Sequence, residues 1–301
     1  MRAHHVNEDS ALYEYLHKAF PHISKARLTA LLSSQAILVN GQISTRHDQL
    51  LKRGDSISIH RRASEPNASL KPRLNFPIVY EDDSVIVIDK PDGLLSMATD
   101  HIKIHTAYHK VTNYVKASDA SRKKRIFIVH RLDRDVSGLL VFAKTEKVKE
   151  FLQTNWKRFE KKYYAIVEGR PKKPEGTIES YLTEDKFRRV YSTRKSPKSK
   201  LSITHYKTLE IWGNYSFLEV SLETGRKNQI RVHMADMGHP IAGDDKYGAK
   251  TNPIHRLGLH AFHLSFKYSA SGKLMTFTSA LPPNFYQLRT TSRVRKQSPS
   301  P

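Results

Sequence analysis

Apolar and polar positions follow two different patterns along the chain, and the change between them divides it into two regions. In residues 11–60, apolar residues recur at helical spacing from Leu12 to Phe20, and again after Ser24, a residue type that begins helices. The Asn-Gly pair at positions 40 and 41 lies between two short apolar runs, as in a tight hairpin. We predict two helices followed by a small hairpin sheet in this region.

From about residue 76 the pattern changes to short alternating or continuously apolar runs, which are typical of strands. Two longer segments, 146–159 and 226–237, instead place their apolar residues on one helical stripe. Many strands with few helices predict an α+β domain on a mixed, mainly antiparallel β-sheet with flanking helices. The predicted strands are 84–89, 126–129, 138–144, 163–168, 204–210, 215–222, 259–266 and 273–278.

Two polar segments without periodicity mark the predicted domain boundaries. Residues 61–75 are polar and contain prolines, which is typical of a linker. Residues 290–301 are predicted to form a disordered tail. The expected organisation is a small domain over 1–60 and a larger one over 76–289.

The chain is strongly basic, with 51 lysines and arginines against 29 acidic residues, a formal net charge of +22. Such an excess favours a polyanionic partner, with nucleic acid first and an anionic membrane second. Most of the excess lies in the larger domain. There, residues 186–200 hold seven basic residues, no acid and two aromatics, which fits either a solvated loop or a flexible arm along a phosphate backbone.

Composition also excludes several classes of protein. No apolar run approaches the roughly 20 residues that span a bilayer, and the first residues lack the apolar core of a signal peptide. The absence of cysteine removes disulfides, thiolate catalysis and zinc knuckles, and is typical of the cytoplasm. The histidines are scattered and no basic amphipathic helix is evident, so we predict neither a metal site nor a membrane partner.

The most informative segment runs from His130 to Lys144. Arg131 and Asp133 follow one apolar run, and a Ser-Gly pair opens the next. An aspartate beside guanidinium groups stays ionised and can act as a nucleophile or general base, although a surface ion pair without function has the same pattern. A carboxylate hydrolase would need a second acid nearby, and Asp135 should point to the opposite side of an extended turn.

This segment resembles the HRLDxxTSGLL signature of the pseudouridine synthases of the RluA type, which implies that Asp133 is the catalytic residue. Residues 89–95, 161–169 and 222–233 are similar to three further segments of that family, in the same order. The resemblance covers residues 78–288, and more loosely 11–60.

The resemblance implies a role for each matching residue. Tyr163 would pack its ring against the target base, and Arg231 would pair with Asp133 and keep it ionised. Arg131 would bind phosphate or fill the space that the base leaves on turning out of its stack. We expect further substrate contacts from His130, Lys90, Arg226 and Gln229.

Two positions depart from the family pattern. Val136 stands where the family usually has threonine, and Asn228 where it usually has histidine. Neither coincides with Asp133, Tyr163 or Arg231, so we expect these changes to affect fine positioning more than activity.

Residues 11–60 resemble the alpha-L RNA-binding motif, which a small-subunit ribosomal protein shares with several RNA-modifying enzymes. The resemblance lies in residues 24–27, 39–41 and 52–55, with lysine at position 25 where arginine is usual. An accessory domain that binds nothing is the alternative. The residues expected to contact RNA are Lys25, Arg27, Arg188, Arg189, Arg194 and Lys195.

The expected function is therefore the isomerisation of uridine to pseudouridine in RNA, a reaction that needs no cofactor and no metal. The added domain implies large-subunit ribosomal RNA as the substrate, with transfer RNA as second choice. We also expect a cytoplasmic protein, from the absence of cysteine, that acts as a monomer. The sequence leaves open whether Asp133 attacks the sugar or removes a proton from it. The alternative is a non-catalytic RNA-binding or ribosome-assembly factor on the same scaffold.

Overall fold

The computed structural model describes residues 4–21, 23–33, 36–59, 74–119, 124–267 and 272–297. The chain divides between Leu70 and Lys71 into an N-terminal and a C-terminal unit. The linker predicted over 61–75 lies outside the described residues, except for Leu74 and Asn75.

The N-terminal unit contains the two predicted helices, α1 (Leu12–Ala19) and α2 (Lys25–Ser33), and the predicted hairpin. Asn40 and Gly41 have φ angles of 51° and 81°, which a two-residue hairpin turn requires. Leucines of both helices share one core with the sheet β1-β6-β3-β4. The strands are β1 (His4–His5), β2 (Ser10–Ala11), β3 (Ile37–Val39), β4 (Gln42–Ile43), β5 (Leu50–Leu51) and β6 (Ser56–Ile59), with β2 pairing β5.

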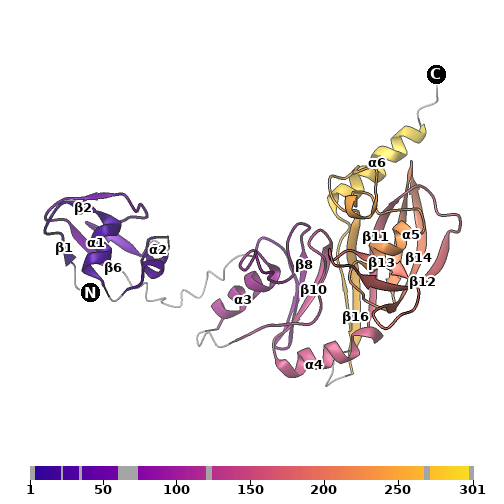
Figure 1. Cartoon of the computed structure of the whole chain (residues 1–301), viewed down its shortest axis with the longest axis horizontal. Helices are drawn as coiled ribbons and strands as arrows, with labels where there is room; N and C mark the ends of the chain where they lie inside the picture. Colours follow the sequence, from indigo (N-terminus) through magenta and orange to yellow (C-terminus); the bar gives the residue numbers. More distant parts are fainter. Residues whose placement is uncertain are drawn as a thin grey trace. The chain divides into compact units, whose positions relative to one another are not determined.

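The C-terminal unit is built on an eleven-stranded sheet in the order β13-β12-β14-β15-β11-β16-β10-β8-β7, with β9 pairing β10 and β17 pairing β16. Its neighbours are antiparallel except β10 and β16, which confirms the mixed, mainly antiparallel prediction (Figure 1). The strands are β7 (Ile78–Glu81), β8 (Val85–Lys90), β9 (Phe127–Ile128), β10 (Ser137–Ala143), β11 (Glu160–Glu168), β12 (Glu175–Glu184), β13 (Val190–Thr193), β14 (Lys200–Trp212), β15 (Tyr215–Leu222), β16 (Leu259–Lys267) and β17 (Leu274–Thr278).

The helices of this unit are α3 (Ala107–Ala117), α4 (Glu146–Asn155), α5 (Gln229–Asp236) and α6 (Pro283–Gln297). One correction concerns the predicted disordered tail, because α6 continues to Gln297 and is fixed at its start by the fully buried Phe285. None of the helices in the described part of the chain has the length and apolar character needed to cross a bilayer.

Strands β8 and β10 are buried on both faces, as their continuous apolar sequences require. Their alternate residues enter two separate hydrophobic clusters. One cluster includes Val111 of α3 and the other includes Leu152 of α4, so these helices cover opposite faces of the sheet. The α3-side cluster also holds Leu132, Val136 and Ile230, and thus lies beneath the segments that carry the candidate site.

Candidate active site

Residues 129–136 connect β9 to β10 and carry Asp133 in a turn. Leu132 and Val136 are buried on either side of it, and the Val136 N–H donates to the Asp133 carbonyl at 3.2 Å. The Ser96 hydroxyl accepts from the Leu132 N–H at 3.1 Å and donates to the Leu132 carbonyl at 2.7 Å. These anchors leave the Asp133 side chain 26% exposed in a fixed position.

Lys90 fastens this turn from the side of β8. Its ammonium donates to the carbonyls of Pro91, Leu94 and Arg134 at 2.8, 2.7 and 3.0 Å, and burial lowers its pKa to about 7. The expectation that Lys90 contacts substrate is therefore wrong, because its side chain is fully covered and its three N–H groups already have acceptors.

Replacing Lys90 with methionine should destabilise the protein and loosen the turn that carries Asp133. Three partly buried carbonyls would lose their donor, at about 1 to 3 kcal/mol for each group left unsatisfied. Denaturant unfolding monitored by circular dichroism should show a loss of several kcal/mol, whereas Lys147→Met at an exposed position of α4 should not. Equal stability of the two variants would contradict this role.

The far end of the turn enters β10 through the Ser-Gly pair. Gly138 has a φ of 113°, and a Cβ atom there would lie 2.2 Å from the Ala261 carbonyl oxygen, so only glycine fits beside β16. Arg256 donates to the Ser137 hydroxyl and to the Asp92 carboxylate, both at 2.7 Å. Arg256 thus joins the loop after β8 to the strand that follows the Asp133 turn.

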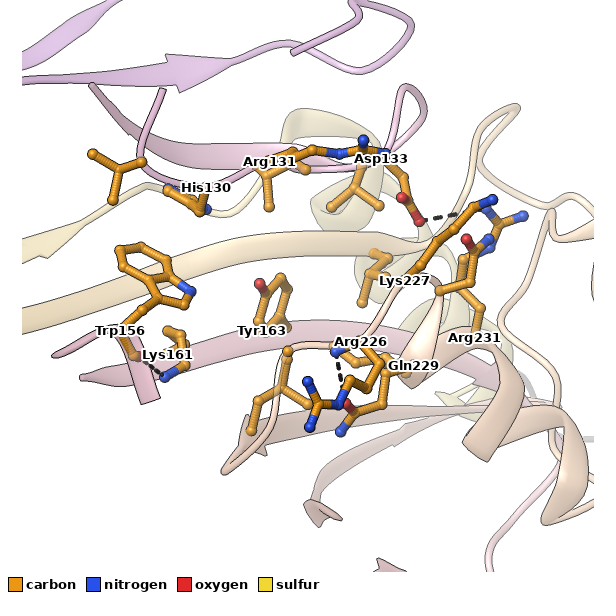
Figure 2. A pocket seen from close by; sticks show the side chains of 18 residues that line it. His130, Arg131, Asp133, Trp156, Lys161, Tyr163, Arg226, Lys227, Gln229 and Arg231 are labelled. Atoms are coloured by element: carbon orange, nitrogen blue, oxygen red, sulfur yellow. Dashed lines mark hydrogen bonds and ion pairs between the residues drawn. The ribbon is translucent and has the colours of Figure 1, made fainter. Parts of the chain in front are cut away.

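Arg231, on α5, faces Asp133 across the site, with 3.7 Å between its Nη1 and the Asp133 Oδ2 (Figure 2). Its Nε and Nη2 donate to the fully buried Asp244 carboxylate, each at 2.7 Å. Burial alone would lower the pKa of Arg231, but the hydrogen bonds and charge of Asp244, with a contribution from Asp133, raise it. Arg231 is therefore a fixed cation with one nitrogen facing Asp133.

Tyr163, on β11, lies beside the Asp133–Arg231 pair in a cavity of about 400 Å³. Burial raises the pKa of its phenol, and the negative charge of Asp133 raises it further, so the ring is neutral. Figure 2 shows Tyr163 between Asp133 at one end and Trp156 with Lys161 at the other. The cavity brings together a carboxylate, a cation and an aromatic ring, which can hold a planar base.

His130 and Arg131 also line this cavity, His130 with a packed ring and Arg131 with an exposed guanidinium. The His130 ring stacks on Trp156 with 4.2 Å between centroids, and its Nε2 accepts from the Val141 N–H. Burial lowers the pKa of His130 to about 3, so it contributes a neutral ring. Arg131 is exposed, and its guanidinium has no partner among the described residues, which leaves it available to an anion.

Arg226 lies in the turn before α5 and Gln229 is the first residue of the helix, and the role of Gln229 differs from the one expected. Arg226 lines the cavity and donates from Nε to the Leu201 carbonyl at 3.2 Å. The Gln229 amide is saturated, accepting from the Arg226 N–H and Thr224 and donating to the Ile203 carbonyl and Thr204. Its expected substrate contact is therefore corrected to a link between α5 and β14.

Asn228 precedes α5 with a φ of 54°, in the left-handed region. Asparagine and histidine are both enriched in this conformation, which accounts for the exchange of one for the other at this position. The other departure, Val136, is an apolar anchor of the turn that carries Asp133.

The segment 186–200 contains the tip of a hairpin, strand β13 and the turn before β14. Strand β13 pairs with β12, and the Asp185 carboxylate closes the turn between them by accepting from the N–H groups of Phe187 and Arg189. Phe187 at the tip of this hairpin is 78% exposed. The expected RNA-binding residues of the segment are exposed, namely Arg188, Arg189, Arg194 and Lys195. In the N-terminal unit Lys25 is exposed, while the Arg27 side chain lies outside the described part of the structure.

Several residues of the site escaped the sequence analysis. Ser96 and Arg256 act through contacts between segments far apart in the chain, and Asp244 through the packing of α5 against the loop that follows it. Trp156 and Lys161 line the cavity opposite Asp133, with the Lys161 ammonium donating to the Trp156 carbonyl at 2.8 Å. The lysine two positions before Tyr163 was the available signal, because alternate residues of a strand share one face.

We expect stability to fall between about pH 6.5 and pH 4. Burial lowers the pKa values of His130, His233 and His260 to about 3, 4 and 4, whereas in the unfolded chain each imidazole protonates near its ordinary value of 6.5. The stabilisation that comes from keeping these imidazoles neutral is complete above pH 6.5 and is lost as the pH falls. At pH 5 the loss is about 2 kcal/mol for each imidazole.

Chemical denaturation at a series of pH values tests this expectation. The variant His233→Gln should reduce the slope of unfolding free energy against pH by one proton in this range. His101→Gln, at an exposed position, is the matched control and should leave the slope unchanged. Equal slopes in all three proteins would contradict the assignment of His233 as a neutral buried group.

The described residues contain no group of three or more histidines and carboxylates placed to hold a metal ion. The site thus offers a half-buried carboxylate facing a fixed arginine, with an aromatic ring beside both. Such a carboxylate can act as a nucleophile or base on a substrate whose planar ring lies on Tyr163.

Two solved structures share the fold of this chain. Human RNA Pseudouridylate Synthase Domain Containing 4 matches with a TM-score of 0.58 and 21% identity, covering 72% of this chain and 92% of that one. Human RNA Pseudouridylate Synthase Domain Containing 1 matches with a TM-score of 0.56 and 20% identity, covering 77% and 100%.

Sequence comparison gives a closer relationship. Ribosomal large subunit pseudouridine synthase D of Neisseria meningitidis serogroup A is 34% identical over 299 residues, covering 93% of this chain and 78% of its relative. The protein of the same name from Haemophilus influenzae is 30% identical, covering 92% and 89%. The family model for RNA pseudouridylate synthase matches residues 84–236, a range that contains Asp133, Tyr163 and Arg231. The chain therefore belongs to the RNA pseudouridylate synthase family.

Proposed function

We propose that the protein converts uridine to pseudouridine in large-subunit ribosomal RNA, with Asp133 as the catalytic residue. The observation that carries the proposal is the carboxylate of Asp133, 3.7 Å from the fixed Arg231 in a cavity shared with Tyr163. The relatives named as large-subunit synthases support ribosomal RNA, and the absence of cysteine supports a cytoplasmic enzyme, which we take to act as a monomer.

The reaction balances without an added reactant. The bond between C1′ of the ribose and N1 of uracil breaks, the base turns, and C1′ forms a bond to C5, while C5 loses a proton and N1 gains one. Tyr163 holds the ring of the extruded base by stacking, which contributes about 1 to 3 kcal/mol per base. The Asp133 carboxylate either attacks C1′ or removes a proton from the sugar, and the Arg231 guanidinium faces it in both routes.

The N-terminal unit is proposed to bind RNA as an alpha-L domain. Its order of two helices, hairpin and strand matches the motif, and Lys25 is exposed at the start of α2. Its small net charge fits a role in orienting the RNA, while the basic C-terminal unit supplies most of the electrostatic attraction.

Two measurements test the proposed function. Purified protein should release tritium from [5-³H]uridine-labelled ribosomal RNA, since C5 loses its hydrogen when the new bond forms. Mapping pseudouridines in total RNA from cells with and without the gene should reveal sites lost from large-subunit RNA. A non-catalytic RNA-binding factor would bind the RNA but release no tritium, and sites lost only from transfer RNA would contradict the proposed substrate.

A further inference from the structure

A second cavity, of about 350 Å³, adjoins the candidate active site. It lies between the β12–β13 hairpin, the beginning of β14 and the turn before α5. Gly225, Arg226 and Lys227 line both cavities, so the two adjoin at this turn. The other residues that line the second cavity are Leu182, Thr183, Glu184, Val190, Lys198 and Lys200.

The lining of this cavity combines an apolar floor with a cationic rim. Leu182 and Val190 are both buried with 4% exposure, and they belong to one small hydrophobic cluster. Against four cations in the lining there is one acid, Glu184, whose carboxylate already pairs with Lys227. The cavity therefore has an uncompensated positive charge next to an apolar surface.

Three of the cations are free to bind a ligand. The ammonium groups of Lys198 and Lys200 have no hydrogen bond or ion pair with any residue that the structure describes, although both side chains line the cavity. The Arg226 Nε donates to the Leu201 carbonyl, and its two terminal nitrogens have no partner among the residues that the structure describes. These groups together can donate to the oxygens of a phosphate.

The backbone that carries the two lysines is held in place. The Ser199 N–H donates to the Ser196 carbonyl at 3.1 Å, and the Ser196 N–H donates to the Ser199 hydroxyl at 2.7 Å. Lys200 begins β14 and pairs in register with Leu182 of β12. A closed turn and a strand thus fix the positions from which both lysines extend.

We propose that this second cavity binds the nucleotide next to the target uridine, with its phosphate on Lys198, Lys200 and Arg226 and its base over Leu182 and Val190. A uridine turned into the first cavity stays covalently linked to its neighbours, so the RNA chain must leave across the rim, and the shared turn at residues 225–227 provides this path. The inference rests on the proposed function, because it requires RNA in the first cavity.

The test compares the double variant Lys198→Ala/Lys200→Ala with the wild-type protein. Binding of fluorescein-labelled single-stranded oligouridylate is measured by fluorescence anisotropy from about 50 to about 200 mM salt, where the logarithm of affinity falls linearly with the logarithm of salt. Loss of two phosphate-facing cations should reduce this slope by about one to two units. The kcat/KM for tritium release from labelled ribosomal RNA should fall about tenfold or more, through KM.

The matched control is Lys172→Ala/Lys173→Ala, which removes two exposed lysines between β11 and β12 that line neither cavity. Equal losses in the two double variants would overturn the inference, because the effect would then be one of general charge. The inference would also be overturned if Lys198→Ala/Lys200→Ala kept the salt slope and the KM of the wild-type protein. In either case, tritium release by the wild-type protein would leave the proposed function standing. Absence of tritium release from the wild-type protein would instead contradict the proposed function itself.

Discussion

Replacing Asp133 with asparagine should abolish pseudouridine formation and leave RNA binding intact. The change keeps the size of the side chain and removes its charge, so the amide can neither attack a sugar carbon nor accept a proton from it. Arg131, Arg226 and the exposed cations of the β12–β13 hairpin are untouched, so the attraction to RNA persists. We expect tritium release to fall by at least about 10⁴-fold, the upper range for removal of a catalytic base.

The stability of this variant should change little, because the ion pair to Arg231 is 3.7 Å long and partly exposed. Asp135→Asn is the matched control, since Asp135 lies two residues away, is exposed and does not line the cavity of Tyr163. Its activity should stay within about twofold of wild type. Tritium release by Asp133→Asn at a tenth of the wild-type rate would remove Asp133 from the chemistry.

The sequence predicts those elements whose burial follows a regular pattern. Strand β15 has the predicted limits Tyr215–Leu222, because its apolar residues enter hydrophobic clusters on both faces of the sheet, Phe217 in one and Leu218 and Val220 in the other. Strand β12 was missed, because most of its residues are partly exposed and its sequence shows no apolar alternation. Helix α3 was missed for a different reason, since its segment is rich in tyrosine, valine, threonine and asparagine, which are weak helix formers.

The residues of the candidate site likewise fall into those that local sequence predicts and those that it does not. Asp133 and its turn lie in one continuous motif, so they could be found from local sequence. Lys90 shows where such reasoning fails, because a lysine after a strand has the same sequence whether it faces RNA or is buried among carbonyl groups. The contact between Arg231 and Asp244 depends on how α5 packs against the loop that follows it, which only the tertiary structure specifies.

Asp244 is the only buried anion that holds Arg231 within the described part of the chain, so its loss should affect both stability and activity. Its carboxylate is fully covered and accepts both Nε and Nη2 of the guanidinium. Replacing Asp244 with alanine would leave a buried cation without its partner, which costs about 3 to 5 kcal/mol. We expect the free energy of unfolding to fall by this amount and kcat to fall by about 10²- to 10³-fold, with a smaller change in KM. Asp245→Ala, at the exposed neighbouring position, is the control and should change neither quantity.

A second variant separates positioning from stability. In Arg231→Met/Asp244→Leu both charges are replaced by apolar groups, so no buried ion is left unpaired and most of the lost stability should return. The activity should not return, because no cation then faces Asp133 and the carboxylate loses the group that fixes and balances its charge. Recovery of kcat together with stability in the double variant would show that Arg231 and Asp244 serve the fold alone. Recovery of stability without kcat would establish Asp244 as the residue that positions Arg231 for the reaction.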